Sequence, residues 1–196
     1  MIKNRGENNI LNNIEQLINP NKKAQVWIET VIYLLIGLAV VGVLLAFIKP
    51  QIDSAVDKSF IEKSIDSLNK IDSTINEIYY VTGNSRSLLL GLKKGEMLIN
   101  STDDMIILTI PDSRYEYSEI GNEVEIPGTR LRVLTREEAG RKDVILTLDY
   151  SDYINITYNS ADSNKLMQSS QNPYTIIIKN NGVFSNITNI DFKISE

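Results

Sequence analysis

Acidic side chains are the residues of this sequence that could support catalysis or bind a metal ion. The 196 residues include no histidine and no cysteine, which excludes zinc sites of the usual Cys/His kind and histidine acid–base catalysis. Adjacent carboxylates occur at Asp103-Asp104 and at Glu137-Glu138. Because neighbouring residues of a strand point to opposite faces of a sheet, a joint catalytic role is disfavoured. We interpret both pairs as solvated turn residues.

A cation that prefers oxygen ligands, such as calcium, could bind at Asp149/Asp152 or at Asp103/Asp104. Neither pair has the spacing of an EF-hand loop. The sequence contains no GxSxG motif, no P-loop and no dinucleotide fingerprint. Its net charge of -5 argues against a nucleic-acid partner. We therefore expect a protein that is not an enzyme and that has no cofactor and no metal.

A long apolar segment near the start of the chain predicts a membrane-spanning helix. Residues 30–48 are uncharged, and the apolar segment begins at Val26, with Glu29 as its one charged residue. At about 1.5 Å per residue, residues 26–48 span a hydrocarbon core of about 30 Å. Basic residues are more frequent before the segment than after it, which favours a cytoplasmic N-terminus and an outward-facing segment 51–196.

The residues that precede the apolar segment do not fit an ordinary secretory signal, whose apolar part is shorter and is followed by a cleavage site. Here a basic pair, Lys22-Lys23, and a small residue, Ala24, come before the apolar segment. If Gln25 is counted as the first residue, Glu29 is the fifth. This arrangement resembles the type IV pilin signal, known in archaea as the class III signal peptide.

The resemblance implies that a prepilin peptidase removes residues 1–24 and that the apolar helix stays on the mature protein. It further implies a structural subunit, a pilin or minor pilin, of an archaeal type IV pilus-like surface filament. The implied partners are copies of the chain or other pilins, the prepilin peptidase, an assembly ATPase and a membrane platform protein. The protein would lie in the archaeal cell membrane first, with its C-terminal domain outside, and in the extracellular filament later. The alternative is a membrane-anchored domain for adhesion or ligand binding that is exported by the same signal without polymerising.

A carboxylate at Glu29 is physically reasonable in this setting. After cleavage the first helical turn carries free N–H groups, the positive end of the helix dipole and a new α-amino group at Gln25. In a filament Glu29 could pair with the amino terminus of a neighbouring subunit; the alternative is an interfacial residue with no role in assembly. Gly37 and Gly42 would allow helices to approach closely, although ordinary use of glycine in membrane helices explains them nearly as well.

Three N-glycosylation sequons occur in the segment expected to face outward, at Asn100, Asn155 and Asn186. Their number is what chance alone predicts from the asparagine, serine and threonine content. Because the pilins of archaea often carry N-glycans, the resemblance makes these residues possible acceptors.

The rest of the chain predicts an α+β fold: a long N-terminal hydrophobic and amphipathic helix followed by an antiparallel β-sandwich-like domain. Residues 25–49 form the apolar part of the helix, and residues 50–83 continue it with an apolar stripe that we expect the following domain to cover. Thr82-Gly83-Asn84 is the expected helix stop. Residues 84–196 show short strands separated by turn residues, among them Asn180-Asn181-Gly182. The segments expected to be strands include 115–120, whereas 160–173 is expected to be a loop.

Overall fold

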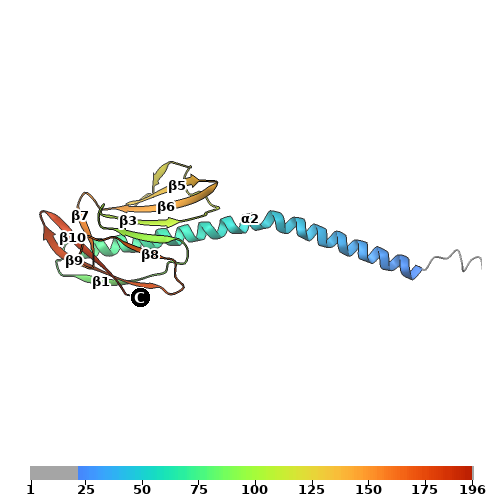
Figure 1. Cartoon of the computed structure of the whole chain (residues 1–196), viewed down its shortest axis with the longest axis horizontal. Coiled ribbons are helices and arrows are strands. Elements are labelled where there is room, and N and C mark those ends of the chain that lie inside the picture. Colours follow the sequence, from blue (N-terminus) through green and yellow to red (C-terminus); the bar gives the residue numbers. More distant parts are fainter. Residues whose placement is uncertain (1–21, 196) are drawn as a thin grey trace, which may run out of the picture. The chain divides into compact units, whose positions relative to one another are not determined.

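The computed structural model describes residues 22–195, and the chain divides into two compact units, Met1–Pro50 and Gln51–Glu196. The α-helix α2 (Lys22–Ile78) supplies the described part of the first unit and the first element of the second (Figure 1). Pro50 lies within α2. The predicted helical segments are therefore present, although α2 ends at Ile78, before the expected stop at Thr82.

The described side chains of the first unit are mostly apolar and exposed. From Val26 to Ile48 the large apolar residues other than Val31 are exposed, with fractions between 47% at Ile48 and 73% at Phe47. By length and composition this helix could cross a membrane, although a signal sequence near an N-terminus has the same properties. An exposed apolar surface of this extent needs a lipid or protein covering.

The second unit contains two β-sheets. One sheet has the strand order β1-β9-β10-β7 and the other has the order β4-β5-β6-β3-β2-β8. All strand pairs are antiparallel except β7 and β10, which run parallel. The strands are β1 (Ser85–Leu90), β2 (Glu96–Asn100), β3 (Met105–Ile110), β4 (Glu123–Glu125), β5 (Leu131–Glu138), β6 (Arg141–Asp149), β7 (Ile154–Tyr158), β8 (Lys165–Gln168), β9 (Tyr174–Phe184) and β10 (Ile187–Ser195).

From Ile61 onward the apolar stripe of α2 lies in the core of the β-domain, as its spacing predicts, whereas Ile52 and Val56 at the start of the expected stripe are 55% and 47% exposed. The helix contributes six buried residues at intervals of three and four to one hydrophobic cluster: Ile61, Ile65, Leu68, Ile71, Ile75 and Ile78. Both sheets contribute to the same cluster, for example through Leu146 of β6 and Ile178 of β9. Figure 1 shows this part of the helix alongside the strands of both sheets. The helix is therefore an integral part of the domain's core.

Two segments of the β-domain differ from the sequence-based expectation. Residues 115–120 are not a strand; only Ile120 forms an isolated bridge, with Thr135 of β5. The expected loop 160–173 contains the short strand β8, which pairs with β2 and places Met167 in the core with 2% of its surface exposed. A single apolar anchor within a polar segment is too weak a pattern to predict a strand.

The expected turn at Asn180-Asn181-Gly182 is instead an irregularity within β9. The register of β9 against β10 shifts there, and Gly182 adopts a φ of 100°. The side-chain Nδ2 of Asn180 donates to the carbonyl oxygens of Ile78 at 2.8 Å and Tyr79 at 2.7 Å. These carbonyls lie at the end of α2, where intrahelical donors run out; that of Ile78 also accepts from the backbone N–H of Val81 at 3.1 Å. Asn180 thus caps the helix from the sheet, and the chain reverses two residues after Val183.

Candidate functional site

The start of α2 contains the residues of the predicted cleavage and assembly site. Residues 1–21 of the predicted leader lie outside the described residues. Lys22, Lys23, Ala24 and Gln25 are helical in the backbone, and their side chains lie outside the described part of the structure.

Glu29 is exposed, and its Oε1 accepts a hydrogen bond from the hydroxyl of Tyr33 at 3.2 Å, one helical turn further on. Among the side chains that the structure describes, Glu29 takes part in no ion pair. An exposed carboxylate with one weak intrahelical hydrogen bond retains acceptor sites for a partner outside the chain. Sequence reasoning missed Tyr33, although its i+4 position relative to Glu29 was a readable signal.

Gly37 and Gly42 lie in open space among the residues that the structure describes. A Cβ added at either position would have no atom within 4 Å. The packing of this chain therefore does not require glycine at these two positions, and any requirement would come from a neighbouring molecule.

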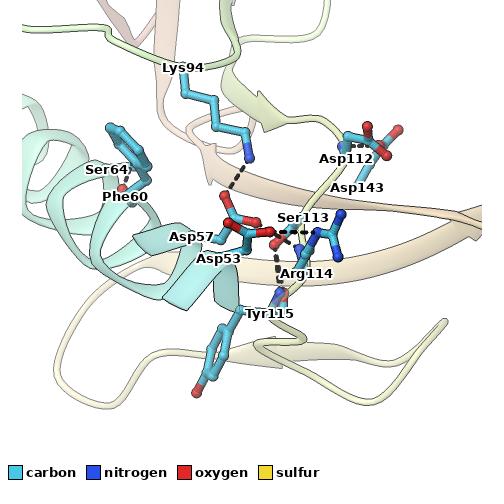
Figure 2. A network of polar contacts seen from close by, with 10 residues as sticks. All are labelled: Asp53, Asp57, Phe60, Ser64, Lys94, Asp112, Ser113, Arg114, Tyr115 and Asp143. Carbon is cyan, nitrogen blue, oxygen red and sulfur yellow. Dashed lines mark hydrogen bonds and ion pairs between the residues drawn. The ribbon is translucent and has the colours of Figure 1, made fainter. Parts of the chain in front are cut away.

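A polar cluster holds the beginning of the second unit's helix to two connections of the β-domain (Figure 2). We call Asp57, Lys94 and Arg114 the helix clamp. Asp57 is 6% exposed, and its carboxylate accepts from the Nζ of Lys94 at 2.5 Å and from the backbone N–H of Arg114 at 2.8 Å. Lys94 belongs to the β1–β2 connection and Arg114 to the β3–β4 connection. One helical carboxylate thus fixes two segments that are distant in the sequence.

Gly95 allows the connection that carries Lys94 to pass close to β3. Its φ is 85°, and a Cβ there would lie 2.2 Å from the carbonyl oxygen of Thr109 on β3. A side chain at this position would both strain the backbone and collide with the neighbouring strand. Glycine is required at residue 95 for the β1–β2 connection to approach β3 this closely.

We expect the Asp57→Asn variant to lose about 1–3 kcal/mol of the free energy of unfolding. The amide would leave the ammonium group of Lys94 without its counter-ion in a largely buried position. The value is at the lower end for a buried pair because the Lys94 side chain is 27% exposed. Urea unfolding of the full chain in detergent would measure the loss.

Asp53→Asn is the matched control for this prediction. It makes the same acid-to-amide change one helical turn earlier, where Asp53 meets the Nε of Arg114 at 3.6 Å and its side chain is 36% exposed. A partly exposed pair of this kind contributes less than about 1 kcal/mol. Equal losses in the two variants would show that Asp57 does not hold the helix to the domain.

A second polar cluster lies further along the helix. The buried hydroxyl of Tyr150 donates to Oδ1 of Asp72 at 2.9 Å, and the guanidinium of Arg130 lies 3.6 Å from the same oxygen. Burial raises the pKa of Tyr150 strongly, and the charge of Asp72 raises it further. Arg130 also donates to the hydroxyl of Tyr153 and stacks over its ring at 5.0 Å from the centroid. Tyr150 is therefore a neutral hydrogen-bond donor that links the end of β6 to α2.

The candidate cation sites hold carboxylates that protein groups already bind. Asp104 accepts from the backbone N–H of Ile156 at 2.7 Å, and burial raises its pKa. Asp149 accepts from the Nη2 of Arg132 at 2.7 Å and from the hydroxyl of Ser151 at 2.7 Å. Burial opposes ionisation of Asp149, but the bonds from Ser151 and Arg132 outweigh it and lower its pKa. Over the described residues, no three acidic side chains are grouped as metal ligands.

The other acidic pair is not in a turn. Glu137 and Glu138 are the last residues of β5, opposite Lys142 and Arg141 of β6. The turn between these strands consists of Ala139 and Gly140, both with positive φ. The pair is exposed, as expected, but it belongs to the strand.

A partly open pocket of about 130 Å³ lies between α2 and the β1–β2 connection. Its lining combines apolar side chains such as Phe60 and Leu92 with Ser64 and Lys63, and no carboxylate lines it.

The three sequon asparagines have different surroundings. Asn100 is 8% exposed and exchanges hydrogen bonds with Asp103, donating to its carboxylate at 2.8 Å. Asn155 is half-buried within β7. Asn186 is exposed in the turn between β9 and β10.

The chain is thus an α+β protein in which a long apolar helix precedes, and then enters, a β-domain of two sheets. Comparisons with protein-family models, curated proteins and solved structures gave no match.

Proposed function

We propose that this protein is a structural subunit, a pilin or minor pilin, of an archaeal type IV pilus-like surface filament. The observation that carries the proposal is the exposed apolar helix from Val26 to Ile48, which follows the basic pair Lys22-Lys23 and includes one carboxylate, Glu29. A soluble domain would not leave such a surface uncovered.

Two successive coverings account for this apolar surface. Lipid covers it while the subunit waits in the membrane, with the β-domain outside the cell. The same helices of other subunits cover it in the filament, where Gly37 and Gly42 permit close approach. A prepilin peptidase, an assembly ATPase and a membrane platform protein would act between these two states.

The exposed carboxylate of Glu29 supports pairing between subunits. Cleavage after Ala24 creates an α-amino group at Gln25, one helical turn before Glu29. A charge is costly in an apolar bundle unless it is paired. In the proposed filament the carboxylate of one subunit pairs with the amino group of the next, so that both buried charges are compensated.

We expect protein from its native cells to begin at Gln25 and to be released by mechanical shearing as a high-mass polymer. Mass spectrometry of the N-terminal peptide would identify the first residue, and sedimentation of the sheared fraction would separate polymers from membranes. Protein that begins at Gln25 but is released only by detergent would support the anchored adhesion or ligand-binding domain instead. Protein that still begins at Met1 would contradict both.

A further inference from the structure

The turn between β9 and β10 presents an acceptor asparagine at the tip of a tight hairpin. Phe184 and Ile187 pair directly, so the turn consists of Ser185 and Asn186. Their φ angles are 51° and 67°. Two central residues with positive φ are the pattern of a type I′ hairpin turn, in which asparagine is among the favoured residues. The sequence Asn186-Ile187-Thr188 is a sequon, so the exposed amide of Asn186 is a potential attachment point.

The residue two positions before this asparagine is an uncovered aromatic. The side chain of Phe184 is 80% exposed, whereas the other described phenylalanine of the β-domain, Phe192, is fully buried. Val183, which precedes it, is 66% exposed. An apolar ring on a hairpin tip gains free energy from any covering that removes it from water. The C–H face of a sugar ring attached at Asn186 is a covering within reach.

The geometry points to one modification: we propose that Asn186 carries an N-linked glycan whose first sugar packs on the ring of Phe184. The proposal rests on the outward placement of the β-domain in the proposed function. In the reaction the side-chain nitrogen of Asn186 attacks the anomeric carbon of a lipid-linked oligosaccharide. The N–C bond forms, the bond from that carbon to the lipid phosphate breaks, and the amide proton is lost to a base of the transferase.

The folded structure disfavours the same modification at the other two sequons. A sugar on Nδ2 of Asn100 would need space that a side chain exposed by 8% does not have, and it would disturb the hydrogen bond to Asp103. Asn155 is the half-buried second residue of β7 and pairs with Asn189 of β10. Leu98 stands two positions before Asn100, and the aromatic two positions before Asn155, Tyr153, is half-buried with Arg130 over its ring.

The surroundings of Thr188 place the transfer before the hairpin is complete. A transferase must reach the hydroxyl residue of the sequon, yet Thr188 is 5% exposed and is paired with Val183 of β9. The sugar is therefore added while β10 is still open at its first residues. Because Asn186 ends up at the exposed tip, pairing of β10 can then proceed with the sugar in place.

Glycopeptide mapping of the protein purified from its native cells tests the site. We expect the glycan on the peptide that contains Asn186, no modification of Asn100, and a loss of mass in the Asn186→Gln variant that Asn155→Gln does not produce. Protease treatment of intact cells reports separately whether the β-domain lies outside. An unmodified Asn186 in an accessible domain would refute the glycan and leave the filament proposal standing, whereas a protected domain would refute the outward placement that both require.

A double-mutant cycle tests the contact with Phe184. We expect Phe184→Ala to lower the Tm of the glycosylated protein by about 2–4 °C more than it lowers the Tm of the Asn186→Gln variant. Phe184→Tyr keeps the aromatic face, so the glycosylated protein should not show this additional loss of Tm. If Phe184→Ala lowered the Tm equally in both backgrounds, the sugar would not pack on this ring.

Discussion

The Glu29→Ala and Glu29→Gln variants are expected to be clipped after Ala24 normally and to yield almost no filaments. Loss of the carboxylate would leave the α-amino group of the neighbouring subunit buried and unpaired. Breaking a buried ion pair from one side costs on the order of 3 kcal/mol, which corresponds to roughly a hundredfold in the equilibrium constant for adding each subunit. The yield of sheared polymer per membrane-inserted subunit is the measurement.

The Tyr33 hydroxyl allows the charge of Glu29 to be separated from its intrahelical hydrogen bond. Tyr33→Phe removes the donor at 3.2 Å and keeps the carboxylate, so filaments should persist. Glu29→Gln keeps an acceptor for Tyr33 and removes the charge, so filaments should be lost. Normal filaments from Glu29→Gln would defeat the pairing proposal.

A block of cleavage provides the complementary control for Glu29. Ala24→Leu places a bulky side chain where the small residue stands and should leave the precursor intact in the membrane. Ala24→Gly keeps a small residue and should be clipped. If the Glu29 variants also accumulated precursor, their lack of filaments would reflect recognition by the peptidase and not pairing between subunits.

The Ile71→Ala variant is expected to lose about 2–5 kcal/mol of the free energy of unfolding. Ile71 is fully buried in the helical stripe at the centre of the β-domain, and truncation leaves a cavity that both sheets would have to close. Urea unfolding of the full chain in detergent, followed by circular dichroism, measures the effect. Because a typical β-domain is only marginally stable, such a loss is a large share of the total.

Ile52→Ala makes the same truncation on the same helix at a position that is 55% exposed. Its effect should stay within about 0.5 kcal/mol. Both variants change the helix propensity by the same amount. The difference between their losses of unfolding free energy therefore measures the effect of burial. Similar losses at both positions would indicate that residues 61–78 do not form part of a shared core.

Regular periodicity made the helix and its covered face predictable from sequence. Ile61, Leu68 and Ile75 recur on one face, and a stripe of that length needs a covering domain. The clamp was not predicted, because its contacts join residues 37 and 57 positions apart in the sequence. A signal was nevertheless present: Asp57 stands one turn before Ile61, in line with the stripe, where a charge requires a buried partner.

Local residue types were misleading where side-chain hydrogen bonds determined the conformation of the backbone. Asn180-Asn181-Gly182 has the composition of a turn, but Asn180 lies within a strand and donates to two carbonyls at the end of α2. Tyr115-Glu116-Tyr117 alternates like a strand, yet the hydroxyl of Ser113 takes up the backbone N–H and carbonyl of Tyr115. Side-chain bonds of this kind compete with a strand ladder, and the residue pattern alone does not reveal them.

The burial of α2 among both sheets determines how the β-domain would respond to tension. A pull along residues 61–78 cannot detach them one by one, because every apolar side chain of the stripe would have to slide past its neighbours at the same moment. Hydrogen bonds at Asp57, before the buried stripe, and from Asn180, at its end, would resist such sliding. A pull along the helix would therefore load the domain in shear, a geometry that would help the proposed filament subunit stay folded when the cell is dragged by flow.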